Sequence, residues 1–301
     1  MPLFIIISGY VTRYSRPLLN RGELWFFVKK RSLAYLLPWA IWTFLVRGLL
    51  FREAGNFNVK FLLWHMDCGY WFLITIWTIS MVFGVADLLS NKIAKEKKSL
   101  NIFLHLAFCG VGMVALGAIG YLLGLSFLGI KLTLYYLPIY LIGYLYGQMQ
   151  DKLMSKSYSK TLVNVTIAVC LGLWLAIINR FDFFGGADTP VMIIFRFFTS
   201  IIGCITVIGL FTNILNGGGI SALLWVGKHS LEVYLSHYLL LNLFHMEQMP
   251  ALMSLSGITL MTVNFLATVG LTSLLIIIVQ HNPVLNYILY AKQSQPASSN
   301  G

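Results

Sequence analysis

The sequence predicts an all-α protein, a polytopic bundle of transmembrane helices. Of its 301 residues, 58% are hydrophobic and 10% are charged, and the mean hydropathy is +0.79. Soluble domains average roughly 45–50% apolar and about 25% charged residues. Apolar runs close to the length of a membrane crossing, about 20 helical residues for a ~30 Å hydrocarbon core, recur along the chain. Open strand edges cannot be satisfied in lipid, so these runs predict helices.

Nine apolar segments form the expected bundle, of which the first is too short to cross a membrane alone. We expect a single transmembrane domain over residues 1–292 and a disordered polar tail over 293–301. The segments are 1–12, 33–51, 70–90, 101–124, 133–149, 161–179, 191–215, 221–244 and 257–280.

The basic residues gather on one side of this bundle. The net charge is +11, but the Lys and Arg residues stand in short loops between apolar runs. That placement favours lipid head groups as partners and argues against nucleic acid. If the segments alternate in direction, loops 13–32, 91–100 and 150–160 and the C-terminus carry most of the positive charge. We therefore expect these parts to face the cytoplasm of a bacterial-type inner membrane.

Four ionisable residues lie inside apolar segments, where charge costs at least ~2.5–3.5 kcal/mol on insertion scales. They are Arg196, Glu232, His237 and His105. For His105 we favour a purely structural role, because it stands alone. Arg196 is a candidate for stabilising charge inside the bundle.

Helical spacing groups the polar residues of segment 221–244. His229, Glu232 and Ser236 share one face, and an adjacent stripe holds Ser230, Tyr234 and His237. Such a wedge cannot face lipid, so it either bonds neighbouring helices together or borders a functional site. Glu232 and His237 lie about 140° apart around the helix and are not expected to pair.

The run Lys29-Lys30-Arg31 precedes the second segment. It is a topology anchor, and Lys30 and Arg31 also offer donors for a phosphate group. The sequence contains no GxGxxG, P-loop, CxxC or HExxH motif, so it predicts neither a nucleotide-binding fingerprint nor a metal site.

Several motifs resemble, in order, the type 3 family of membrane acyltransferases, which are bacterial O-acyltransferases that modify surface sugars. The motif at 227–237 is similar to the late G-x-x-S-L-E-x-Y-x-x-H signature of that family. The matching stretches are FIIISGY at 4–10, Lys30-Arg31 followed by Pro38, WFL at 71–73, LPIYLIGY at 137–144 and GKHSLEVYLSH at 227–237.

The resemblance implies transfer of an acyl group, usually from cytoplasmic acetyl-CoA, to a hydroxyl of a glycan or lipid-linked sugar. It implies catalytic roles for Glu232, His237 and Arg196, and contact of Lys30 and Arg31 with the CoA phosphates. Two departures stand out. The family's first helix, which bears a basic residue and an essential His, is expected to be missing, and Ala34 replaces the second Arg of an R-x-x-R pair. The alternatives are a non-enzymatic carrier or channel and an inactive truncated pseudoenzyme.

Overall fold

A computed structural model describes residues 1–44, 63–64, 70–94, 97–154, 160–180, 189–214, 221–241 and 254–292. Throughout these residues the regular structure is helical and no strand occurs, which confirms the predicted all-α fold. Six helices within them are long and apolar enough to cross a membrane. The tail expected over 293–301 lies outside the described residues.

The chain forms two compact units. The first comprises Met1–Leu24 and Thr78–Gly218, and the second comprises Trp25–Trp77 and Gly219–Gly301. The first unit contains α1 Pro2–Val11, the short helix η1 Thr12–Tyr14, most of α4 Trp71–Ala94, α5 Lys98–Leu123, η3 Phe127–Gly129, α6 Ile130–Met154, α7 Lys160–Arg180, α8 Pro190–Gly209 and the π-helical turn η4 Leu210–Ile214.

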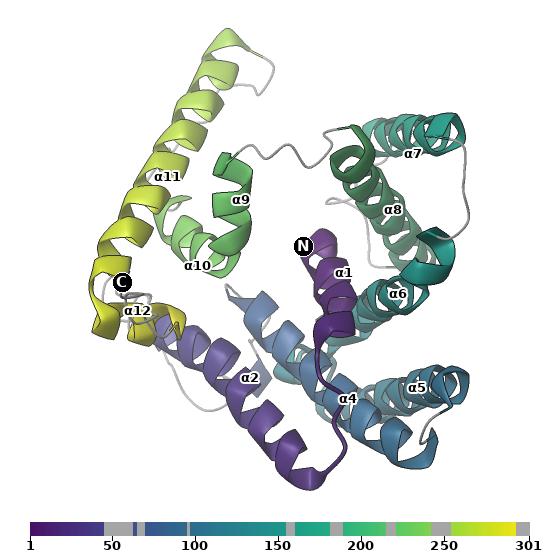
Figure 1. The fold of residues 1–301 in the computed structure, drawn as a ribbon. Helices are drawn as coiled ribbons and strands as arrows, with labels where there is room; N and C mark the ends of the chain where they lie inside the picture. Colours follow the sequence, from purple (N-terminus) through teal and green to yellow (C-terminus); the bar gives the residue numbers. More distant parts are fainter. Residues whose placement is uncertain are drawn as a thin grey trace, which may run out of the picture. The chain divides into compact units, whose positions relative to one another are not determined.

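Helix α1 packs on α6 with its backbone almost in contact (Figure 1). A side chain at Gly9 would overlap the carbonyl oxygen of Tyr140, and one at Gly143 would overlap that of Ile6. A Cβ atom on Gly147, one turn later, would lie 3.0 Å from the oxygen of Tyr10. Small residues at such spacing let helix backbones approach closely where no hydrophobic effect drives them together.

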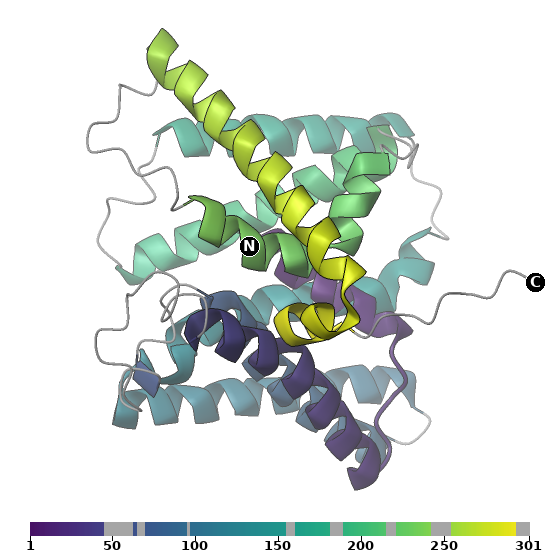
Figure 2. The ribbon, with the colours of Figure 1, turned by 90° about the vertical axis from the view of Figure 1, so that its left-hand side faces the viewer.

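The second unit contains most of α2 Arg21–Ile41, α9 Ser221–Lys228, α10 Ser230–Leu241, α11 Leu255–His281 and α12 Pro283–Tyr290. Its buried core includes Trp42, Tyr70, Leu235, Ile276 and Tyr290. Figure 2 shows the short α12 turning off the end of α11. This turn brings the end of the described chain back toward α10.

The structure corrects three boundaries. Helix α2 begins at Arg21 instead of residue 33, so the loop expected over 13–32 is wrong from Arg21 onward. Its basic run is part of the helix, because Arg and Lys are good helix formers. Segment 221–244 is divided at His229 into α9 and α10. Helix α12 follows α11 where we expected no element.

Candidate active site

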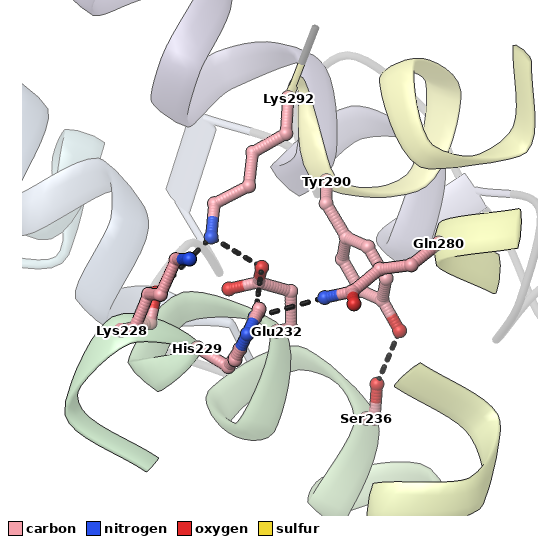
Figure 3. Close-up of polar contacts among 7 residues, drawn as sticks. All are labelled: Lys228, His229, Glu232, Ser236, Gln280, Tyr290 and Lys292. Atoms are coloured by element: carbon pink, nitrogen blue, oxygen red, sulfur yellow. Dashed lines mark hydrogen bonds and ion pairs between the residues drawn. The ribbon is translucent and has the colours of Figure 1, made fainter. Parts of the chain in front are cut away.

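A cluster of polar side chains lies where α9, α10, α11 and α12 meet in the second unit (Figure 3). His229 stands in the turn between α9 and α10, yet its backbone N–H donates to Trp225 and its carbonyl accepts from Val233, at 3.0 and 2.9 Å. The helical path therefore continues through the turn. His229, Glu232 and Ser236 consequently share a face and are all buried, as the spacing predicted.

The residues at the two ends of the short helix α12 determine where it begins and where it stops. Asn282 caps it, accepting hydrogen bonds from the backbone N–H groups of Val284 and Leu285 at 3.0 and 3.2 Å, and Pro283 occupies the first helical position. Both choices are favourable at a helix start. At the other end Ala291 adopts the left-handed conformation with φ 52°. This reversal directs Lys292 back toward α10.

Glu232 is the centre of the cluster. Its side chain is fully buried, and its Oε1 forms an ion pair with the Nζ of Lys292, whose side chain is 38% exposed. The same Nζ donates to the carbonyl oxygen of Lys228 at 3.1 Å. Oε1 also lies 3.1 Å from Nδ1 of His229. The second oxygen, Oε2, is buried and has no hydrogen-bond partner among the described residues.

Nδ1 of His229 has a second neighbour. The side-chain nitrogen of Gln280, on α11, lies 2.8 Å from it, and Figure 3 shows Gln280 and Glu232 converging on the same ring atom. The indole of Trp225 flanks the imidazole, with ring centroids 4.7 Å apart. The imidazole of His229 therefore has contacts on one face, with Trp225, and at one nitrogen, Nδ1.

A hydrogen bond ties α10 to α12 two turns into α10. The Ser236 hydroxyl lies 2.8 Å from the hydroxyl of Tyr290. Burial raises the pKa of Tyr290 to about 12, so it stays protonated at neutral pH. Next to it, Trp42 donates to the carbonyl of Leu289 at 2.8 Å. The aromatic side chains of Tyr290 and Trp42 thus border the polar cluster.

His237 lies outside this cluster. It is half-buried, and its Nδ1 is 3.0 Å from the carbonyl oxygen of Val233, one turn back on the same helix. Its ring lies 5.9 Å from that of Tyr234. The partners of Glu232 are Lys292 and His229, and His237 is not among them. Its catalytic role stays a prediction.

The other predicted site residues lie elsewhere. Arg196 is on α8 in the first unit, close enough to Tyr135 to interact electrostatically with it, and its role in stabilising charge stays a prediction. On α2, Lys30 is exposed, while the guanidinium of Arg31 lies over the rings of Phe27 and Tyr35, at 5.4 and 5.9 Å. Arg31 also donates to the Tyr35 hydroxyl at 3.1 Å.

The first unit holds a carboxylate that the sequence analysis missed. Asp87, on α4, accepts a hydrogen bond from the backbone N–H of Leu18 at 2.8 Å and lies 3.8 Å from Nδ1 of His105. His105 is fully buried, with its ring 4.3 Å from Phe83 and 4.7 Å from Tyr144. Its packing between two rings agrees with the structural role expected for it.

Gln280, Tyr290 and Lys292 were also missed as site residues. The Asn-Pro pair that opens α12 was the available signal, because it marks a helix start. Among the described residues no group of three or more His, Cys, Asp or Glu side chains could hold a metal ion.

Comparison with known proteins gives one finding. The sequence matches the family model of the type 3 acyltransferases, described as an acyltransferase domain, over residues 1–279. No curated protein and no solved structure matches the chain. The match includes Glu232 and His229, whereas Gln280, α12 and Lys292 follow it.

Proposed function

The chain belongs to the type 3 acyltransferase family, and we propose that this multi-pass membrane acyltransferase moves an acyl group, in particular acetyl, from cytoplasmic acyl-CoA to a hydroxyl of a glycan or lipid-linked sugar. Acyl transfer to a hydroxyl needs a group that accepts the hydroxyl proton and a charge that stabilises the tetrahedral oxyanion. Glu232 and its neighbours are our candidates for the first task, with His237 as a further relay, and Arg196 is our candidate for the second.

The unpartnered oxygen of Glu232 is the observation that carries this proposal. A buried carboxylate oxygen without a hydrogen bond costs about 1–3 kcal/mol or more, so native proteins rarely leave one unused. A sugar hydroxyl is a donor of the right kind for Oε2. A merely structural ion pair would not require the second oxygen to stay open.

The proposed binding site for the acyl donor is on α2. Lys30 is exposed, and Arg31 is held between two rings that limit its rotamers. A guanidinium that lies over two rings, next to an exposed ammonium, suits the phosphates of CoA, since Arg forms forked hydrogen bonds and Lys contributes a point charge. These phosphates approach from the side on which we expect the basic loops and the C-terminus, the cytoplasm of a bacterial cell.

Transfer of label from radioactive acetyl-CoA to the glycan and glycolipid fraction of inverted membrane vesicles tests the function. The wild-type protein should label this fraction, and Glu232→Gln should reduce labelling by about 100-fold or more, the size expected for a positioned proton-transfer group. Glu23→Gln, at an exposed glutamate of α2, is the matched control. Equal labelling by wild type and Glu232→Gln at equal protein level would contradict the proposed site.

Acyl-CoA binding tests the donor end separately. Lys30→Ala combined with Arg31→Ala should weaken binding of acetyl-CoA to the purified protein, most clearly at low salt, because screening reduces attraction between exposed charges. The control is Lys97→Ala with Lys98→Ala, an exposed adjacent pair at the start of α5. If both double variants bind equally well, Lys30 and Arg31 serve as topology anchors only.

The orientation has its own test. A single cysteine at Lys98, in a version without the native thiols, should react with a membrane-impermeant maleimide only after the cells are permeabilised. Strong labelling of intact cells would reverse the proposed topology.

A further inference from the structure

One face of α2 points into the second unit. Phe27, Arg31 and Tyr35 follow one another at intervals of four residues, so they share this face. Tyr35 packs against the buried core of the unit. The guanidinium of Arg31 lies over both rings and donates to the Tyr35 hydroxyl. The cation of this inward stripe therefore has its partners within the protein.

The opposite face of α2 carries a second stripe of the same spacing. Trp25, Lys29 and Leu33 stand two positions earlier, about 200° around the helix from the inward stripe. Trp25 and Leu33 are 70% and 43% exposed, and Lys29 is exposed. Phe26, which is 69% exposed, lies beside this outward stripe. No hydrogen bond, ion pair or ring contact joins Trp25 or Lys29 to any of the described residues. The outward stripe therefore presents a cation between two large apolar side chains.

The charge pattern of α2 places the outward stripe at the membrane surface. Charged residues occur from Arg21 to Arg31, whereas the stretch from Ser32 to Ile41 contains none. Because charge is costly in hydrocarbon, we expect the first half of the helix at the level of the head groups and only the second half among acyl chains. Trp25 and Phe26 precede Arg31, so they belong to the head-group region, where aromatic rings are enriched.

An orientation of this half-helix along the surface would bury its exposed rings. A first half that projected away from the bilayer would leave Trp25 and Phe26 in water. A helix at the interface instead buries its apolar face at the boundary between head groups and acyl chains. The methylene stem of Lys29 would then lie along apolar surface while its ammonium reaches the phosphates.

The charges of this half-helix favour an anionic partner. Glu23 is the acidic residue of α2, and its carboxylate accepts a hydrogen bond from the backbone N–H of Leu19 at 2.7 Å. It stands about 120° around the helix from Lys29. The carboxylate is therefore used at the start of the helix and does not neutralise Lys29. A lysine near an anionic leaflet is attracted to it, and neighbouring Lys30 adds to this attraction.

We propose that the outward stripe, with Phe26 beside it, is a binding site for the head group of an anionic phospholipid. Lys29 binds the phosphate, while Trp25 and Leu33 pack against the glycerol backbone and the nearest part of the acyl chains. The partner is the lipid of the membrane surface. This site is independent of acyl transfer, and the candidate donor residue Arg31 is on the opposite face of the helix.

Fluorescence quenching in liposomes tests the site. In a version of the full chain without the native thiols, a bimane label attached at Phe26→Cys replaces the phenyl ring. Lipids with brominated acyl chains should quench this label, and brominated phosphatidylglycerol should be preferred over brominated phosphatidylcholine. Lys29→Gln should lower this preference about fivefold, the effect of one basic residue at an anionic surface. Raised salt should lower it as well.

Two controls accompany this measurement. Lys98→Gln removes an exposed lysine of α5 and should leave the preference unchanged. A label at Val114, 74% exposed in the middle of α5, should be quenched equally by the two lipids, because acyl chains are expected there. An unquenched label at position 26 would show that protein or water covers the stripe, and equal quenching would show lipid contact without head-group selection. Either result, or an unchanged preference in Lys29→Gln, would overturn the proposal, and none of them bears on acyl transfer.

Discussion

The crossing of α1 with α6 and the cluster between α10 and α12 are held together in opposite ways. At the crossing, Gly9 and Gly143 remove side chains so that two backbones meet, and hydrogen bonds from Tyr10 and Arg13 to Gln150 lie at its end. In the cluster, Glu232 and Lys292 bring two charges together and surround them with hydrogen bonds. The comparison shows two ways to position helices. In the first unit close backbone packing sets the position of α1 on α6, whereas in the second unit paired polar groups set how α10 and α12 are arranged.

The two regions should therefore fail differently. In lipid, helix association depends on van der Waals packing and on hydrogen bonds between helices, since lipid tails are as apolar as the side chains. Steric change should disrupt the crossing, and charge change should disrupt the cluster.

The largest effect is expected from filling the crossing. Gly143→Ala places a methyl group against the backbone oxygen of Ile6. A backbone atom within a helix cannot move without its neighbours, so we expect the free energy of unfolding to fall by about 3 kcal/mol, at the upper end for overpacking. Gly117→Ala, on α5 with nothing within 4 Å of the new atom, should be neutral or slightly stabilising. Thermal unfolding in detergent measures the stability of both variants. Equal melting temperatures would contradict the close packing of α1 on α6.

Removing the cation of Lys292 should lower the free energy of unfolding somewhat less than filling the crossing does. Lys292→Met leaves the carboxylate of Glu232 buried without its ion-pair partner. Loss of one partner of a fully buried pair costs about 3–5 kcal/mol, and because Lys292 is 38% exposed we expect about 2 kcal/mol. Adding Glu232→Gln should recover part of the loss. A double variant no more stable than Lys292→Met would show that the two charges are not coupled.

Tyr290→Phe should cost about 1 kcal/mol at pH 8, through the lost hydrogen bond to buried Ser236. The raised pKa gives this difference a pH dependence. An unfolded tyrosine ionises near pH 10, whereas folded Tyr290 does so at about 12, so the wild type loses stability as pH rises from about 10 to 12. Phe has no such loss. The deficit of the variant should therefore shrink above pH 10, and a deficit constant with pH would contradict the buried environment of the hydroxyl.

The smallest effect is a gain. Ala291→Gly should relieve the left-handed conformation at the end of α12, which costs a residue with a Cβ roughly 1–2 kcal/mol, less the extra entropy of glycine in the unfolded chain. We expect a net gain of about 0.5 kcal/mol. The opposite sign, a loss of about 0.5–1 kcal/mol, is expected for Ala115→Gly in the middle of α5. If both variants lose stability equally, the turn at Ala291 is not strained.

The sequence predicts the crossing and the cluster to different extents. Composition and run length identify the helices because crossing lipid constrains every residue of a segment. Residue spacing also places His229, Glu232 and Ser236 on one buried face. The start of α2 was missed because its basic run looks like a loop, although Lys and Arg are good helix formers.

The cation that pairs with Glu232 could not be predicted. Lys292 is 60 positions away along the chain, and it reaches the carboxylate only through the turn at α12. No periodicity connects residues on different helices, so the choice among the cations of the chain depends on tertiary packing. The same holds for Asp87, which lies within an apolar run and meets Leu18 from a distant segment.

The 60-residue separation has a consequence for biogenesis. At translation rates of about 5–20 residues per second, Glu232 is synthesised roughly 3–12 seconds before Lys292. During that interval α10 carries a carboxylate whose cation has not yet been made. A glutamate at membrane depth without a counter-charge must be protonated or hydrated. The helix that bears Glu232 therefore reaches its final charge state only when the last turn of the described chain folds back onto it.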